Sequence, residues 1–135
     1  MLTFRHQDVL DYGIDRIKTA CNSIALINYA YARGDAYATV RGAANINIIA
    51  EATGLTSADF TVANQGTLGR KVSNAIKTAI CVKQSNGTST QLGFAFLDTV
   101  NSKVLAICDE GTDKIIYVGD TVTFPITDIN ANQPT

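Results

Sequence analysis

Residues 89–109, STQLGFAFLDTVNSKVLAICD, consist of two apolar segments joined by a short polar one. The side chains of the first segment divide between two strand faces, with Leu92, Phe94 and Phe96 on one face and Ala95 and Leu97 on the other. The pair Asn101-Ser102 favours a tight turn, and the apolar residues 103–109 continue as a second strand. We therefore predict an antiparallel hairpin in this stretch.

A longer strand is predicted before this hairpin, at residues 70–83. Its apolar side chains alternate roughly with lysines, Val72, Ile76 and Ile80 against Lys71, Lys77 and Lys83. The lysines, together with Arg70, would form a basic stripe that is either solvated or in contact with an acidic partner. Asn86-Gly87 follows and is a strong hairpin signal, so we expect 70–83 to pair with 89–99.

Two more strands are predicted after the hairpin. Turn residues at 110–113 lead into 114–118, and Gly119-Asp120 leads into 121–129. In this last segment the side chains expected on one face are Val122, Phe124 and Ile126. Pro125 has no N–H to donate to a sheet, so this strand is expected to be an edge strand or to contain a bulge there.

Turn signals every 8–12 residues are typical of a β-sandwich or a small barrel. Glu occurs only at positions 51 and 110 whereas Thr is abundant, which also favours strands over helices. We predict a mainly β protein, an antiparallel β-sandwich (jelly-roll-like) with one N-terminal α-helix. The expected core residues are Leu26, Ile48, Phe60, Val72, Ile80, Phe94, Phe96, Leu105, Ile107, Ile116 and Phe124.

The N-terminal helix is expected at residues 5–20, where Leu10, Ile14 and Ile17 fall on one helical face. The predicted organisation is a helical segment at 1–21, a single β-sandwich domain at 22–129 and a loose C-terminal tail at 130–135.

The region between the helix and residue 61 is mixed. Residues 23–31 are expected to form a strand, 34–40 a loop or short helical turn, and 44–52 an extended segment. Thr56 or Ser57 is expected to cap a short turn before Phe60.

Charge and cysteine content indicate a reducing cytoplasm as the place of synthesis. The net charge of −1 gives no general reason to bind nucleic acid or an anionic membrane. Charged residues interrupt the first twenty positions, unlike a signal peptide, and no apolar run reaches the roughly 18–20 residues of a membrane span. The three cysteines, Cys21, Cys81 and Cys108, are predicted to be reduced, mostly buried thiols.

No motif predicts catalysis or a cofactor. The single histidine, His6, has no partner at a catalytic spacing. The acidic turn of Asp109, Glu110 and Asp113 lacks the pattern of a calcium loop, which favours a solvated turn. We expect a non-enzymatic protein without metal or cofactor. The alternative is a small enzyme or ligand-binding barrel whose polar groups would be Cys108, Asp109 and Tyr117.

Four segments carry a resemblance to a known group of proteins. They are Asp59-Phe60-Thr61, Gly69-Arg70-Lys71-Val72, Gly87-Thr88-Ser89-Thr90 and the run from Gly119 to Ile129. In this order they resemble small structural proteins of tailed bacteriophages, over about four fifths of the chain. The segment 34–44 is longer than in that group, and Cys108 departs from its pattern.

The resemblance implies a virion component that binds other virion proteins. The first expectation is a capsid decoration or cementing protein on the lattice of the major capsid protein, present as a homo-oligomer. The alternatives are a tail- or fibre-associated structural or host-binding module, or an assembly factor absent from the mature particle. We expect the partner contacts to involve Phe4, Arg5, His6, Tyr29, Tyr31, Arg33, Tyr37, Arg41 and Lys71.

Overall fold

A computed structural model of the chain describes residues 3–5, 13–32, 34–65, 69–87, 91–109 and 115–132. The strands are β1 (Thr3–Arg5), β2 (Ser23–Asn28), β3 (Ile48–Thr53), β4 (Phe60–Gln65), β5 (Gly69–Asn74), β6 (Lys77–Ile80), β7 (Leu92–Asp98), β8 (Lys103–Asp109), β9 (Thr121–Phe124) and β10 (Asp128–Asn132). The helical elements are α2 (Asp15–Ala20), α3 (Tyr37–Arg41), and the 3-10 turns η1 (Ala43–Asn45) and η2 (Ser57–Asp59).

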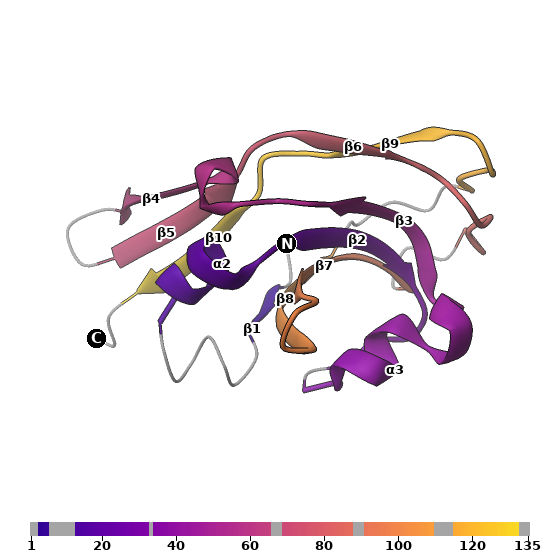
Figure 1. The fold of residues 1–135 in the computed structure, drawn as a ribbon, viewed down its shortest axis with the longest axis horizontal. Helices are drawn as coiled ribbons and strands as arrows, with labels where there is room; N and C mark the ends of the chain where they lie inside the picture. The colour runs from indigo at the N-terminus through magenta and orange to yellow at the C-terminus, as the bar shows by residue number, and fades with distance from the viewer. Residues whose placement is uncertain are drawn as a thin grey trace.

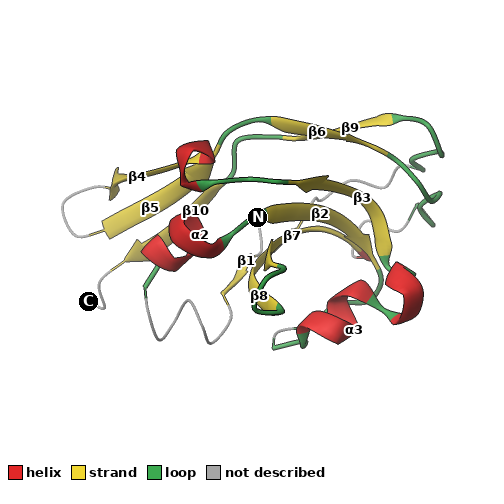
Figure 2. Ribbon diagram, in the orientation of Figure 1, coloured by secondary structure: helices red, strands yellow, loops and turns green. Residues whose placement is uncertain are grey.

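The predicted fold class is confirmed: the protein is mainly β, with antiparallel sheets in a sandwich-like arrangement and an N-terminal helix, and it is not a closed barrel. One layer is a sheet of five strands in the order β1-β8-β7-β2-β3. The strands β5, β6, β9 and β10 arch over this sheet, with β4 at one end, and α3 lies below it (Figures 1 and 2).

The hairpin predicted at residues 89–109 is confirmed as β7 and β8, which pair from Gly93↔Asp109 to Asp98↔Lys103. Its turn is held by the buried carboxylate of Asp98, which accepts the backbone N–H groups of Val100 and Asn101 at 3.1 Å each. Ser102 adopts φ 56°, in the left-handed region that such a tight turn requires.

The strands β2, β7 and β8 of the five-stranded sheet have buried side chains on both faces. Leu92, Phe94 and Phe96 of β7 belong to the core cluster between the layers, whereas Ala95 and Leu97 belong to a second cluster on the opposite face. This division matches the predicted alternation. The second cluster is covered by Val40 of α3 and by Tyr29, Tyr31 and Tyr37.

The strand predicted at 70–83 is present as β5 and β6, but its predicted pairing with 89–99 is wrong. β5 pairs with β10, and β6 pairs with β9, both antiparallel. The first ladder ends at the pair Ser73–Asp128, and the second begins at the pair Lys77–Phe124. The stretch between the ladders, 74–76 on one strand and 125–127 on the other, therefore has equal length on both strands. β5–β6 and β9–β10 therefore form one long ribbon in a single register.

Asn86-Gly87 does not form the expected hairpin because Asn86 is held by the other layer. Its backbone N–H donates to Asn28 Oδ1 at 2.8 Å, and its side-chain amide donates to Gln91 Oε1 at 2.6 Å. The chain therefore crosses from the ribbon to β7 at this point instead of turning back on β6.

Pro125 interrupts the ribbon, as its missing N–H predicts, and Asn74 bridges the gap. Asn74 Nδ2 donates to Pro125 O, and Asn74 Oδ1 accepts the N–H of Thr127, both at 2.9 Å. The Asn74 side chain is buried at 4% exposure, so these bonds replace ladder bonds that the backbone cannot make.

We expect Asn74→Leu to destabilise the protein by about 2 kcal/mol, because it leaves Pro125 O and the Thr127 N–H without partners in a buried position. Asn74→Asp keeps an acceptor for Thr127 but places a buried carboxylate against Pro125 O, so it should also destabilise the protein. Urea denaturation followed by circular dichroism measures both variants. An Asn74→Leu protein as stable as the wild type would contradict the bridging role.

The same interruption explains three errors in the predicted facing of side chains. Val72 and Asn74 point inward before the break, whereas Ala79 and Cys81 do so after it. The alternation therefore reverses at residues 75–76, and it reverses opposite them at Pro125. Ile80 was expected in the core, and Ile76 and Ile126 were expected on the same strand face as core residues. All three side chains are instead exposed, by 56–61%. The other ten expected core residues are buried.

Both ends of the chain differ from the prediction. Arg5 lies in β1, which pairs with β8, and the helix begins only at Asp15, with residues 6–12 outside the described part. Residues 130–132 belong to β10, so this part of the tail is paired with β5 rather than loose. The strand expected at 114–118 is wrong for residues 115–118, which are not in a strand; residue 114 lies outside the described part.

The middle region agrees with the prediction in part. The alternative of a short helical turn is confirmed by α3, and the strand predicted at 23–31 is present as β2 over 23–28. The extended segment predicted at 44–52 is confirmed by β3 from residue 48 onward but is wrong for 44–47, which lie in η1 and the turn after it. Thr56 caps η2 in a reciprocal capping box with Asp59. The buried Ile17 anchors α2, and Lys18 Nζ donates to the carbonyl of Phe60 at 2.7 Å.

Candidate interaction surfaces

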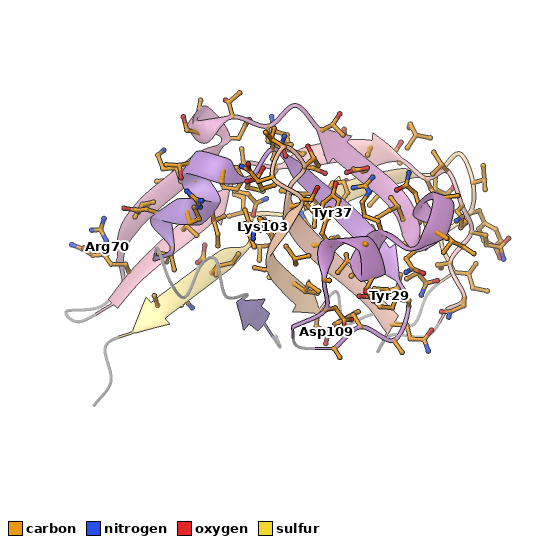
Figure 3. All side chains as sticks on the ribbon, turned by 60° about the horizontal axis from the view of Figure 1, so that its bottom comes forward. Tyr29, Tyr37, Arg70, Lys103 and Asp109 are labelled. Carbon is orange, nitrogen blue, oxygen red and sulfur yellow. The ribbon has the colours of Figure 1, made fainter. Side chains whose placement is uncertain are left out.

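Four of the residues predicted to contact a partner form two contacting pairs on the side of the sheet that α3 covers. Tyr29 and Tyr31 follow β2 and meet edge to face, with ring centroids 6.2 Å apart. Arg41 lies over the Tyr37 ring at 5.6 Å from its centroid. Tyr37 begins α3, and Tyr29 lies beside Asp109 at the end of β8 (Figure 3). We call Tyr29, Tyr31, Tyr37 and Arg41 the tyrosine–arginine cluster.

The tyrosines of this cluster are held by the protein itself. Tyr29 donates its hydroxyl to Asp35 Oδ2 at 2.7 Å, and burial together with this carboxylate raises the pKa of Tyr29. Tyr31 donates to the carbonyl of Leu92 at 3.3 Å. Its ring lies against Gly93, where an added Cβ would approach Tyr31 Cε1 to 2.9 Å. These rings therefore cover the sheet, whatever further contacts they make.

Arg41 forms a bidentate ion pair with Glu51 of β3. Its Nη1 and Nη2 donate to Glu51 Oε2 and Oε1 at 2.9 and 2.7 Å, and each side chain is 17% exposed. Ser23 of β2 donates to the same carboxylate. The hydrogen bond from Arg41 holds the pKa of Glu51 below its usual value, against the opposing effect of burial. The pair thus ties α3 to the sheet.

The predicted basic stripe does not form, because each lysine has its own partner. Lys71 pairs with Asp128 at 3.1 Å and Lys77 with Asp59 at 2.7 Å, while Lys83 Nζ donates to the carbonyl of Ile46 at 2.6 Å. Lys71 also lies away from the tyrosine–arginine cluster, since its neighbour Arg70 is at the opposite end of the molecule (Figure 3).

The remaining predicted contact residues are in the N-terminal segment and the loop before α3. Phe4 and Arg5 lie in β1, opposite Ile107 and Ala106 of β8. His6 and Arg33 fall outside the described residues.

A second exposed surface was not predicted. On the outer side of the β6–β9 pair the exposed side chains are apolar or β-branched, namely Ile76, Thr78, Ile80, Val82, Thr121 and Thr123. We call this set the ribbon face. Its signal, the alternation of Ile, Thr, Ile and Val from 76 to 82, was present in the sequence, but Ile80 was assigned to the core and Ile76 to the same strand face.

The ribbon face is almost free of charge. In residues 75–82 and 115–127 the charged side chains are Lys77, which pairs with Asp59, and Asp120. Ile80 is 56% exposed and Val82 is 68% exposed. Scattered apolar side chains are normal on a protein surface, but a contiguous row of them marks an interaction site.

A cavity of about 410 Å³ lies between β9 and the five-stranded sheet. Leu26 of β2 and Phe94 of β7 line it on one side, and Val122 of β9 lines it on the other. Ile115, Ile116 and Asp120 complete the lining together with Thr121 and Thr123.

The three cysteines form no disulfide and are buried, as predicted. Burial raises the pKa of the Cys21 thiol to about 12, and Cys108 is fully buried. A buried, protonated thiol is a poor nucleophile. Tyr117, the other group proposed for a small-molecule site with Cys108, is 55% exposed.

We expect the native protein to show no thiol that reacts within minutes with an aromatic disulfide reagent at pH 8, because only an accessible thiolate attacks it. All three cysteines should react after denaturation in guanidinium chloride, which serves as the control. A single fast-reacting thiol in the folded protein would instead favour the enzyme or ligand-binding alternative.

The described ranges hold no group of three or more His, Cys, Asp or Glu side chains placed to bind a metal ion. Glu110 and Asp113 of the acidic turn lie outside them. Within the same ranges, no helix has the length and apolar character needed to cross a membrane.

Comparison with known proteins gives no relative from which a function could be transferred. No family model, curated protein or solved structure matches the chain. The functional argument therefore depends on the surfaces described above and on the sequence resemblance.

Proposed function

We propose that this chain is a non-enzymatic structural protein of a tailed bacteriophage that decorates or cements the capsid by binding the lattice of the major capsid protein. The observation that carries the proposal is the ribbon face, an exposed and nearly uncharged row of β-branched side chains. Such a surface is suited to a protein partner, because docking buries apolar area without leaving charges unpaired.

The sequence resemblance supports the same assignment. Gly69-Arg70-Lys71-Val72 lies in β5, and the run from Gly119 to Ile129 contains β9 and the start of β10. Two of the four resembling segments thus lie in strands of the ribbon. In this proposal the protein acts as a homo-oligomer in the virion, after synthesis in the host cytoplasm, and binds neither nucleic acid nor membrane.

Quantitative protein composition of purified particles tests the proposal, with copy number scaled to the major capsid protein. A lattice-binding protein is repeated by the symmetry of the capsid, so hundreds of copies per particle are expected. Absence from the particle would contradict the proposal.

A binding experiment tests the surface. Purified protein is added to capsids that lack it, and Ile80→Glu is expected to weaken binding at least tenfold, because it places a charge in the apolar ribbon face. Val100→Glu is the matched control, since Val100 is 80% exposed in the β7–β8 turn. Equal loss in both variants would mean that the ribbon face is not the contact surface.

The tyrosine–arginine cluster favours a second candidate function, a tail- or fibre-associated structural or host-binding module. Tyrosine rings fixed by hydrogen bonds make rigid contacts at low entropic cost. Copy number distinguishes the two functions, because a tail or fibre position requires only a handful of copies per particle.

A further inference from the structure

We propose that the outer edge of β9 binds an extended segment of a partner protein, which adds as a strand and places an apolar side chain in the adjacent cavity. This inference deepens the proposed function, since it specifies how a virion partner would be held. It stands on the backbone geometry of the ribbon and on the cavity beside it.

The register of the ribbon determines which backbone groups point outward. Cys81 N–H donates to Asp120 O at 2.8 Å, so Cys81 and Asp120 occupy a hydrogen-bonded position. Antiparallel positions alternate, and Thr78 faces Thr123 while Ile80 faces Thr121 in the positions between. The N–H and C=O groups of Thr121 and Thr123 therefore point away from β6.

On the β9 side these outward groups have no partner strand among the described residues. Among the described residues, no backbone partner is found for Thr121 or Thr123 beyond β6. The opposite edge of the ribbon is closed near its end, where Val82 N–H donates to Ile49 O of β3 at 2.8 Å. An unpaired strand edge is a template for pairing with another extended chain.

The cavity beside this edge indicates the chemistry of the partner. Its volume of about 410 Å³ lies within the range of ligand pockets, and Leu26 and Phe94 form an apolar floor. Asp120 is the one charged residue among its described lining residues. A strand on β9 directs alternate side chains into this space, so the partner segment should carry alternating apolar residues and a basic residue near Asp120.

The length of the interaction is limited by β9 itself. This strand has four residues and is followed by Pro125, which has no N–H. The added strand is therefore short, about four residues in register with 121–124, and a short peptide is an adequate probe.

The probe is the blocked heptapeptide acetyl-Lys-Val-Thr-Val-Thr-Val-Lys-amide, and the readout is amide hydrogen exchange and chemical shift by NMR. In the free protein the amides of Thr121 and Thr123 should exchange fast, and those of Val122 and Phe124 slowly. The peptide should slow Thr121 and Thr123 at least tenfold and leave Thr78 unchanged. The same peptide with proline at its central position is the control, because it cannot form the ladder.

Two variants at one register position make the test specific. Thr123→Pro removes an N–H on the proposed edge, and Thr78→Pro removes its counterpart on the opposite edge. Proline is tolerated where the N–H is not used in the sheet. Thr123→Pro should weaken peptide binding at least tenfold and Thr78→Pro should not, with thermal unfolding as the check that both fold.

The outcomes separate this inference from the proposed function. Absence of peptide-induced protection at Thr121 and Thr123, or equal weakening by both variants, overturns strand addition even if the protein binds capsids. If the Thr121 and Thr123 amides exchange slowly without the peptide, and the protein is dimeric in solution, the edge of β9 is occupied by a second copy of this chain. That result also overturns the inference of a different partner protein. Peptide binding by a protein that does not bind capsids supports the strand-addition site and contradicts the virion assignment.

Discussion

Phe96→Ala is expected to destabilise the protein by about 3–5 kcal/mol, the usual cost of truncating a fully buried phenylalanine. Phe96 is 1% exposed and lies in β7, between Ile24 of β2 and Ala106 of β8. The side chain belongs to the core between the two layers, so its removal leaves a cavity that both sheets would have to close.

Such a loss is a large share of the stability of a domain of this size, which is on the order of 5–15 kcal/mol. The measurement is urea denaturation followed by circular dichroism, because the chain has no tryptophan. Val100→Ala is the control and should change stability by less than about 0.5 kcal/mol, since its side chain is 80% exposed. A Phe96→Ala loss below about 1 kcal/mol would contradict the assigned facing of β7.

Arg41→Met is expected to destabilise the protein by about 3 kcal/mol at pH 7, because it leaves the Glu51 carboxylate largely buried without its cation. Arg41 makes both hydrogen bonds of a bidentate pair and packs over Tyr37, so methionine keeps the packing but not the charge. Glu51→Gln should also destabilise, since Arg41 then loses its carboxylate.

The effect of Arg41→Met should depend on pH in a defined direction. The pKa of Glu51 in the folded protein lies below its ordinary value of 4.5, chiefly because Arg41 donates to it. The stabilisation from the pair is therefore complete above about pH 4.5 and is lost as the pH falls through the lower folded-state value. The difference between wild type and Arg41→Met should shrink between pH 7 and pH 3.

Lys71→Met provides the control for this ion pair. Lys71 and Asp128 also bridge two strands, but their side chains are 33% and 44% exposed. Removing such an exposed pair should cost less than about 1 kcal/mol. If Arg41→Met and Lys71→Met had equal effects at pH 7, the Arg41–Glu51 pair would be no more than a surface interaction.

The elements predicted correctly were those whose structure is determined by residues close together in the sequence. The β7–β8 hairpin follows from alternating side chains and a turn at Asn101-Ser102, and η2 follows from the capping box at Thr56. These features are decided within a few residues along the chain. They could be read without knowledge of the rest of the protein.

The errors concern contacts between distant parts of the chain. Asn86-Gly87 has the local signature of a hairpin, yet Asn86 bonds to Asn28, 58 residues away. Pro125 was expected to disturb one strand, but the bridge from Asn74, 51 residues away, reverses the alternation in both strands of the ribbon. As a result Ile80 is exposed rather than buried.

The candidate surfaces show the same division. The sequence singled out Tyr29, Tyr31, Tyr37 and Arg41, which the structure brings together, but it also included Lys71, which lies elsewhere. The ribbon face was missed because Ile80 was assigned to the core and Ile76 to the same strand face. That the tyrosine–arginine cluster or the ribbon face contacts a partner stays a prediction.

By itself the sequence determined the fold class, most of the core and the central hairpin, because alternation and turn residues act over a few positions. Only the tertiary structure decided which strands pair, which face of the ribbon is exposed and which strand edge is open. Those features depend on the burial of each strand against partners far away in the chain, where the free energy of packing overrides local preference.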